Sequence, residues 1–242
     1  GGEAGDKAKV LALGWSLGGG IVVNTLAEQA QGASGPGRGH AGRWSALDGA
    51  VALGMPHDMR RSNRICEERP FSRQVYNRVV ARNLLEMLRP HVELYTCGPI
   101  ARWSDDAPVI DVDVGLLLAA TSIGDIDEAL TRRVFGYASV DEYYRHASPF
   151  QRIEGAAEAA PLLMVTAADD PVVTGWAPLE EVRRSPHAIL AYTTHGGHLG
   201  WQDEADAQHS AWLETVTADF FDAVVAGRGA VVNPQEKKRN TM

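Results

Sequence analysis

Short apolar runs separated by helical patterns recur along this chain. Val10–Leu13 is a continuous apolar run, and a helical pattern follows it from Leu17 to about Gln29. Further apolar runs lie at 46–54, 161–167 and 188–192. Runs of this kind are typical of strands buried on both faces of a parallel sheet, and the helical segments between them predict βα units. The pattern therefore predicts an α/β fold, with helices on both faces of a mostly parallel sheet.

The interval from 57 to 150 departs from this alternation. It has helical patterns at 71–88 and 126–135 and few strand signals, so we interpret 57–150 as a helical, lid-like insertion within one domain that spans 1–226. Residues 205–226 are predicted to form the last helix. The Gly- and Pro-rich stretch 31–39 indicates a surface insertion, and the polar tail 227–242 is predicted to be disordered.

Composition and charge narrow the class of protein. The chain has 242 residues, of which 45% are hydrophobic, and this is enough for one sizeable core. Its formal charge of -8 argues against nucleic acid as a partner. The two cysteines, Cys66 and Cys97, have no metal-ligand spacing and cannot form a disulfide framework, which fits a reducing compartment. We expect no bound metal and a cytoplasmic or membrane-associated location.

No segment is long enough to predict a transmembrane helix. The longest apolar stretch, 112–120, is interrupted by Asp113 and is shorter than the roughly 20 residues that a spanning helix needs. The first residues lack a starting Met and the pattern of a signal peptide. We therefore expect a chain that lacks an N-terminal part.

A candidate nucleophile lies directly after the first predicted strand. Gly14-Trp15-Ser16-Leu17-Gly18 fits G-x-S-x-G, the turn that exposes a serine between a strand and a helix. At a helix start the N–H of Leu17 has no partner within the helix, so it is the candidate donor to an oxyanion. Each of the three glycines 18–20 costs a helix about 1 kcal/mol relative to Ala. We therefore expect close approach to the sheet or to a substrate to explain them.

A serine hydroxyl needs a base, and the base needs an orienting acid. In α/β-hydrolases these residues follow the serine in the order acid, then histidine, after late strands. Two carboxylates, Asp169 and Asp170, follow the strand predicted at 161–167. We assign the acid to Asp170, which lies three residues after Ala167 as in the usual G-x-x-D pattern, and keep Asp169 as the alternative.

The candidate base follows the last predicted strand. Thr193-Thr194-His195-Gly196-Gly197-His198-Leu199-Gly200 contains two histidines, and the glycines on both sides of His198 would let a loop present its imidazole. We assign the base to His198 and keep His195 as its rival. The remaining histidines, including His57, have no evident partner and are expected to have no role in catalysis.

Several of these motifs together resemble one family. The chain is similar to the alpha/beta-hydrolase-domain esterases and phospholipases that include bacterial YheT and the plant embryogenesis-associated proteins. The resemblance covers roughly residues 8–222. The matching segments are Gly14-Trp15-Ser16-Leu17-Gly18-Gly19 with Asn24, Phe135-Gly136-Tyr137, Asp141-Glu142-Tyr143-Tyr144-Arg145-His146-Ala147-Ser148, Asp169-Asp170-Pro171 and Gly196-Gly197-His198-Leu199-Gly200.

The resemblance implies a serine hydrolase with Ser16, Asp170 and His198 as its triad and without a cofactor. It implies substrates that are esters of medium or long acyl chains, including acylglycerols and phospholipids, and frequent association with membrane surfaces. Tyr143, Tyr144 and Ser148 also match, and we interpret them as residues that pack the lid against the core. In that family several strands precede the nucleophile strand, and a loop among them, commonly with a His-Gly sequence, supplies a second oxyanion donor. This part is absent from the present sequence.

Two alternatives to ester hydrolysis remain open at this point. The same acyl-enzyme on Ser16 can be intercepted by an alcohol, which would make the protein an acyltransferase. The chain can also be a catalytically silent binding protein of the same fold. The absence of a second oxyanion donor favours the silent protein, whereas the presence of all three triad residues in the correct order favours an enzyme.

Overall fold

The computed structural model describes residues 8–31, 47–96, 112–201 and 211–227. The chain folds into two compact units. The sheet unit comprises 1–57, 149–170 and 175–242, and the helical unit comprises 58–148 and 171–174. The helical unit lies mostly within the interval 57–150, whose role as a lid-like insertion stays a prediction. The Gly-rich insertion expected at 31–39 and the tail expected at 227–242 lie outside the described residues except at Gln31 and Gly227.

Within its described residues, the sheet unit is built on four parallel strands in the order β1-β2-β3-β4. The strands are β1 (Leu11–Trp15), β2 (Gly49–Leu53), β3 (Leu162–Ala167) and β4 (Ala188–Thr193). Each corresponds to one of the four apolar runs, and β2 and β3 are buried along their whole length. The predicted α/β fold with a parallel sheet is confirmed.

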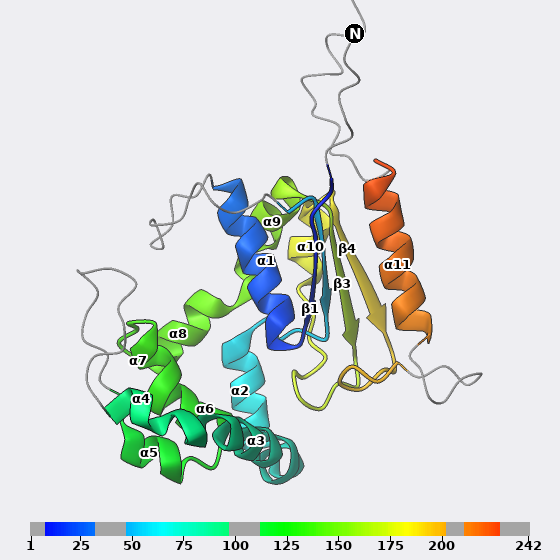
Figure 1. Ribbon diagram of the computed structural model, residues 1–242. Coiled ribbons are helices and arrows are strands. Elements are labelled where there is room, and N and C mark those ends of the chain that lie inside the picture. Colours follow the sequence, from blue (N-terminus) through cyan, green and yellow to red (C-terminus); the bar gives the residue numbers. More distant parts are fainter. Residues whose placement is uncertain (1–7, 32–46, 97–111, 202–210, 228–242) are drawn as a thin grey trace, which may run out of the picture. The chain divides into compact units, whose positions relative to one another are not determined.

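Helices cover both faces of this sheet, as Figure 1 shows. Alternate strand residues point to opposite faces, because side chains alternate along a strand. Ala50 and Ala52 face α1 (Leu17–Ala30) and α9 (Ile153–Ala159), whereas Val51 and Leu53 face α11 (Ala211–Val225). The short elements η4 (Pro149–Arg152) and α10 (Leu179–Arg184) complete the described helices of this unit.

The helical unit has a core of its own. Its residues Ala81, Leu85, Leu117 and Ala129 are buried against one another. Its described elements are α2 (Met59–Glu68), η1 (Ser72–Asn77), α3 (Arg78–Leu88), η2 (Arg89–His91), α4 (Val92–Thr96), α5 (Val114–Ala119), α6 (Ile123–Ile126), η3 (Asp127–Thr131), α7 (Arg132–Val134) and α8 (Val140–Ala147).

Two buried side chains from different elements of the helical unit form a polar pair. Tyr144, which is buried next to Tyr143 on α8, donates a hydrogen bond of 2.7 Å from its hydroxyl to Asp127 of η3. Burial raises the pKa of the Asp127 carboxyl. The hydrogen bond offsets part of the cost of burying this carboxylate, so the pair links α8 to η3.

The four residues 171–174 follow Asp170 and belong to the helical unit. Their carbonyl groups accept hydrogen bonds from side chains of α2. Ser62 donates from its hydroxyl to the carbonyl of Val173 at 3.1 Å, and Cys66 donates from its thiol to the carbonyl of Val172 at 3.0 Å. The main chain therefore passes into the helical unit directly after Asp170.

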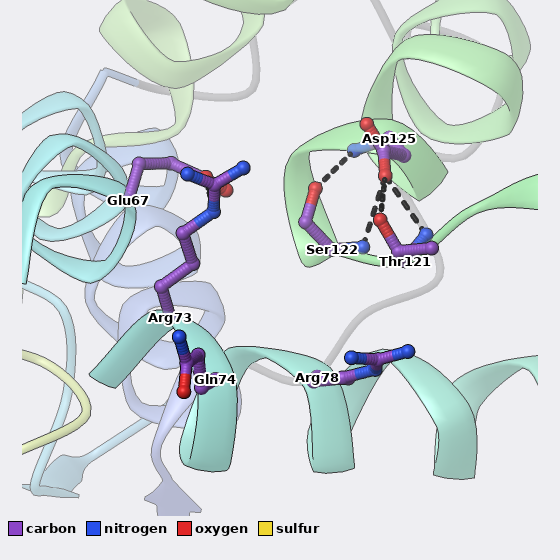
Figure 2. Close-up of a pocket in the computed structure, with 7 residues that line it drawn as sticks. All are labelled: Glu67, Arg73, Gln74, Arg78, Thr121, Ser122 and Asp125. Carbon is purple, nitrogen blue, oxygen red and sulfur yellow. Dashed lines mark hydrogen bonds and ion pairs between the residues drawn. The ribbon is translucent and has the colours of Figure 1, made fainter. Parts of the chain in front are cut away.

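The helical unit contains a polar cavity of about 240 Å³, shown in Figure 2. Its lining is entirely from this unit and consists of Glu67, Arg73, Gln74, Arg78, Thr121, Ser122 and Asp125. The Asp125 carboxylate accepts hydrogen bonds from the backbone and hydroxyl of Thr121 and from the backbone of Ser122.

Among the described helices of the whole chain, none is both long enough and apolar enough to cross a bilayer.

Candidate active site

The structure brings Ser16, His198 and Asp170 together in the sheet unit. His198 Nε2 lies 3.1 Å from Ser16 Oγ, and His198 Nδ1 lies 2.9 Å from Asp170 Oδ2. The Asp170 side chain is fully buried and that of His198 is 20% exposed. An ionised carboxylate can only accept, so Nδ1–H donates to Asp170 and leaves Nε2 as the acceptor for the serine hydroxyl. The three side chains thus form one continuous hydrogen-bonded series.

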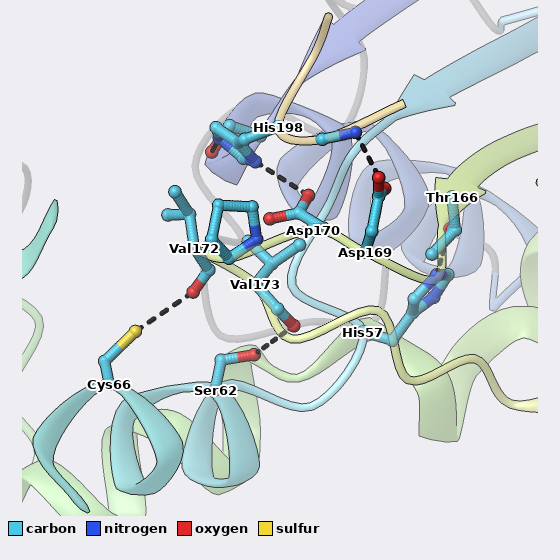
Figure 3. A network of polar contacts seen from close by, with 12 residues as sticks. His57, Ser62, Cys66, Thr166, Asp169, Asp170, Val172, Val173 and His198 are labelled. Carbon is cyan, nitrogen blue, oxygen red and sulfur yellow. Dashed lines mark hydrogen bonds and ion pairs between the residues drawn. The ribbon is translucent and has the colours of Figure 1, made fainter. Parts of the chain in front are cut away.

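Parallel pairing explains why residues so distant in sequence meet. Ser16 follows β1, Asp170 follows β3, and His198 follows β4. All four strands run in the same direction, so their carboxyl ends lie at one edge of the sheet. Figure 3 shows the Asp170 carboxylate directed toward the His198 ring at this edge.

The turn at Ser16 has a backbone conformation that L-residues rarely adopt. Ser16 has φ 49° and ψ -125°, and its N–H donates to the carbonyl of Leu53 at 2.8 Å, which ties the turn to the end of β2. A Cβ atom on Gly14 would lie 2.3 Å from the carbonyl oxygen of Gly18. The turn can therefore form only when position 14 has no side chain, and the strain at Ser16 is held by these neighbours.

The three glycines at the start of α1 have different environments. A Cβ on Gly19 would meet the Cβ of Met55 at 2.9 Å, so this glycine allows α1 to approach the chain that leaves β2. Nothing lies within 4 Å of a Cβ on Gly18, and on Gly20 the nearest atom would be at an ordinary 3.7 Å. The expected close approach to the protein is found at Gly19 and not at Gly18 or Gly20, where close approach to a substrate stays a prediction.

Leu17 is the first residue of α1. The N–H groups of the first helical turn have no acceptor within the helix and lie at the positive end of the helix dipole. The Leu17 N–H therefore follows the Ser16 hydroxyl in sequence at a position suited to a developing negative charge.

The residues kept as alternatives form a second pair beside the first. Asp169 accepts a hydrogen bond of 2.8 Å from the backbone N–H of Gly197, and its other oxygen lies 3.4 Å from Nδ1 of His195. The Gly197 hydrogen bond lowers the pKa of the Asp169 carboxyl; burial opposes this shift, and the contact with His195 adds a smaller lowering. The His195 side chain is 89% exposed, so His195 lies at the surface, and Asp169 holds the residue before His198.

Internal contacts fix the loop that carries His198. Trp201 donates from its indole to the hydroxyl of Thr193 at 2.9 Å, and a Cβ on Gly196 would lie 2.4 Å from the same indole nitrogen. Gly197 and Leu199 on either side of His198 have φ of 55° and 68°. The glycines of this loop thus serve close packing and positive φ angles.

His57 has a partner that the sequence did not reveal. It is buried after β2, and its Nε2 lies 2.8 Å from the hydroxyl of Thr166 on β3. Its ring packs edge-on to Trp176, and its Nδ1 has no hydrogen-bond partner among the described residues. Burial lowers the pKa of His57 to about 3, so the ring stays neutral at neutral pH. No local signal could have revealed this contact, because His57 and Thr166 are 109 residues apart.

The described residues contain no group of His, Cys, Asp and Glu side chains that could hold a metal ion. The arrangement around Ser16 is suited to acid–base chemistry. It contains a hydroxyl, an imidazole that can accept its proton, and a buried carboxylate behind the imidazole.

Comparison with known proteins finds lipases and phospholipases as relatives. The chain is 29% identical over 193 residues to "Monoacylglycerol lipase" of Saccharomyces cerevisiae, an alignment that covers 80% of this chain and 38% of that protein. It is 27% identical over 221 residues to "Embryogenesis-associated protein EMB8" of Picea glauca, which covers 90% and 43%. It is 25% identical over 220 residues to "Phospholipase ABHD3" of Bos taurus, which covers 90% and 47%.

The chain therefore spans less than half the length of these curated relatives. No protein-family model matches it. Among solved structures, it is similar to the monoacylglycerol lipase of Paleococcus ferrophilus with a TM-score of 0.40 and 14% identity, over 90% of this chain and 68% of that one.

The contrast between Gly14 and Gly18 is testable by substitution. We expect Gly14→Ala to lower the free energy of unfolding by on the order of 2 kcal/mol, because the added methyl group meets backbone that cannot easily move. Gly18→Ala meets open space within α1, so it should leave stability unchanged or raise it by up to about 1 kcal/mol. Urea denaturation of both variants measures the difference. Equal effects of the two substitutions would contradict this account of the turn.

His57 should make the fold sensitive to acid. The unfolded chain binds a proton at His57 near pH 6.5, whereas the folded chain does so only near pH 3. Stability contributed by the neutral ring is therefore complete above pH 6.5 and falls by about 1.4 kcal/mol for each pH unit below it, until about pH 3. His57→Phe should remove this slope.

The measurement is urea denaturation between pH 7 and pH 4, with a substitution of the exposed His91, His91→Gln, as the control that keeps the slope. The variants are compared by the slope of the free energy of unfolding against pH. Absolute stabilities are not compared, because His57→Phe also leaves the Thr166 hydroxyl without its partner and so lowers stability at every pH. A slope that is the same in His57→Phe and in the unmodified protein would show that other groups cause the acid sensitivity.

Proposed function

Because the chain is a homologue of abhydrolase-domain lipases and phospholipases, we propose that it is a serine hydrolase that cleaves carboxylic esters through an acyl-enzyme on Ser16. The observation that carries the proposal is the hydrogen-bonded series Ser16–His198–Asp170. A dead site has no physical need to keep a strained serine, a base and a buried acid in this order.

In the first half of the reaction, Ser16 Oγ attacks the ester carbonyl while His198 Nε2 takes the hydroxyl proton. The imidazolium that forms is stabilised by the Asp170 carboxylate, which stays ionised. The Leu17 N–H donates to the oxyanion of the tetrahedral intermediate. His198 then gives the proton to the departing alcohol, and the acyl group remains on Ser16.

In the second half, water attacks the acyl-enzyme and His198 takes its proton. The second tetrahedral intermediate collapses, the carboxylic acid leaves, and the proton returns to Ser16 Oγ. The three residues thus end in their starting protonation states. No step requires a metal or an organic cofactor.

For the substrate we propose esters of medium or long acyl chains, of the acylglycerol or phospholipid type. The support for this class comes from the names of the relatives, which are a monoacylglycerol lipase and a phospholipase. Those proteins are more than twice as long as the matched region, so the assignment of substrate to this chain is part of the proposal.

The reactivity of Ser16 tests the proposal directly. A fluorophosphonate probe should label the protein at Ser16, and Ser16→Ala should abolish labelling and lower hydrolysis of a monoacylglycerol by at least about a thousandfold. Labelling is followed by gel fluorescence, and hydrolysis by release of fatty acid. Ser139→Ala is a matched control, because Ser139 is the N-cap residue of α8 in the helical unit.

A folded protein without Ser16-dependent labelling would reject the enzyme and leave a binding protein. Labelling with no fatty acid released, but with acyl transfer to an added alcohol, would identify a transferase in place of a hydrolase.

Substitution of Asp169 and of Asp170 should have different effects on the rate of probe labelling. Asp169→Ala removes the acceptor of the Gly197 N–H, and we expect it to slow probe labelling by about fivefold to twentyfold, the value of one hydrogen bond. Asp169→Asn keeps an acceptor oxygen and should restore the rate. Asp170→Asn should slow labelling by on the order of a thousandfold or more, because an amide favours the wrong tautomer of His198.

The pseudo-first-order rate of labelling measures all three variants, and near-native thermal unfolding confirms that each is folded. If Asp169→Asn were as slow as Asp169→Ala, the charge of Asp169 rather than its hydrogen bond would matter. If Asp170→Asn labelled at the native rate, Asp170 would not be the orienting acid.

A further inference from the structure

One face of the helix formed by η1 and α3 carries exposed apolar side chains. Phe71 at the N-cap of η1, Val75 on η1 and Val79 on α3 recur every four residues, and their exposed fractions are 65%, 38% and 47%. We call these three residues the α3 strip. The side of the same helix that includes Ala81 and Leu85 is buried in the core of the helical unit. The strip therefore lies on the side of the helix away from the described core of its own unit.

Arginines accompany the α3 strip on the same helix. Arg78 and Arg82 lie within one turn of Val79 and are both exposed. Arg82 forms a largely exposed ion pair with Glu86 at 3.4 Å. Ion pairs of this kind contribute little to folding stability, so Arg82 is able to bind another anion instead. The Arg78 side chain has no hydrogen bond or ion pair with any described residue. In Figure 2 it lies on the same helix as Gln74, at the polar cavity.

The local charge contrasts with that of the whole chain. The segment 59–89 contains eight arginines, three glutamates and no lysine or aspartate, a balance of +5 in a chain whose formal charge is -8. Arginine is the side chain best suited to phosphate, because its planar guanidinium donates two parallel hydrogen bonds. A helix face that combines apolar side chains with cations is typical of helices that lie in the interface of a membrane.

We propose that the α3 strip and its arginines form a docking surface for an anionic lipid bilayer. Phe71, Val75 and Val79 enter the boundary between headgroups and acyl chains, and Arg78 and Arg82 bind the phosphates of neighbouring lipids. Charge complementarity selects this partner, since an apolar face alone would accept a protein equally well. The proposal goes beyond ester hydrolysis, because it concerns where the protein binds and requires no reaction.

The experiment is co-sedimentation of the full chain with vesicles. Vesicles of phosphatidylcholine mixed with phosphatidylserine should bind the protein, whereas vesicles of phosphatidylcholine alone should bind it at least tenfold more weakly. Added salt should weaken binding to the mixed vesicles, because it screens exposed charges. Ser16→Ala should bind as the unmodified protein does, so that a failure of the proposed function and a failure of docking are separate results.

Two variants of the surface separate its charges from its apolar groups. Arg78→Gln with Arg82→Gln should weaken binding to the mixed vesicles by about fivefold for each arginine. Phe71→Ser with Val79→Ser should weaken it by tenfold or more, even at low salt. The matched control combines Arg183→Gln on α10 with Val225→Ser on α11, which are exposed positions in the sheet unit. This control should bind normally.

Several results would overturn the proposal. They are equal binding to vesicles with and without phosphatidylserine, no binding to either, and surface variants that bind as the control does. Thermal unfolding of each variant confirms folding, and the exposed single variant Arg78→Gln serves if a double variant is unstable. Binding to a protein or nucleic acid without binding to anionic vesicles would also reject a lipid partner.

Discussion

The contact of 3.1 Å between Ser16 Oγ and His198 Nε2 is the interaction on which the rest of the candidate site depends. It joins residues 182 positions apart, and no local segment could hold them together. The pairing of four parallel strands does so, because it ends β1, β3 and β4 at one edge of the sheet. The buried residues of β2 and β3 are therefore as necessary to the site as the polar side chains at its surface.

The two adjacent carboxylates after β3 have different roles in this site. Asp170 is fully buried and binds the ring of His198, so it sets the tautomer. Asp169 is partly exposed and binds the backbone N–H of Gly197, so it sets the position of the loop. Both residues lie in the turn after β3, where the Asp170 N–H donates to the carbonyl of Ala167, and each carboxylate meets a different part of the same histidine loop.

Local sequence predicted much of this arrangement, because its determinants are local. The apolar runs predicted all four strands, and the glycine spacing around Ser16 predicted a turn that only Gly14 permits. Contacts across the fold could not be predicted in the same way. The partnership of His57 with Thr166 depends on strand order, and the open space around Gly18 could not be distinguished from the tight packing at Gly19 by residue type.

The two units have separate cores. A substitution at the surface of one unit therefore need not disturb the packing that supports the surface of the other. The buried residues of the sheet unit set the geometry at Ser16, whereas those of the helical unit present the α3 strip. Arg78 is exposed and belongs to neither described core, so we expect a substitution there to change affinity for a lipid surface with little cost in folding. A substitution at Gly14 does the opposite, because it disturbs the backbone on which the nucleophile is held. Binding at a surface and chemistry at Ser16 are thus physically distinct properties of one chain.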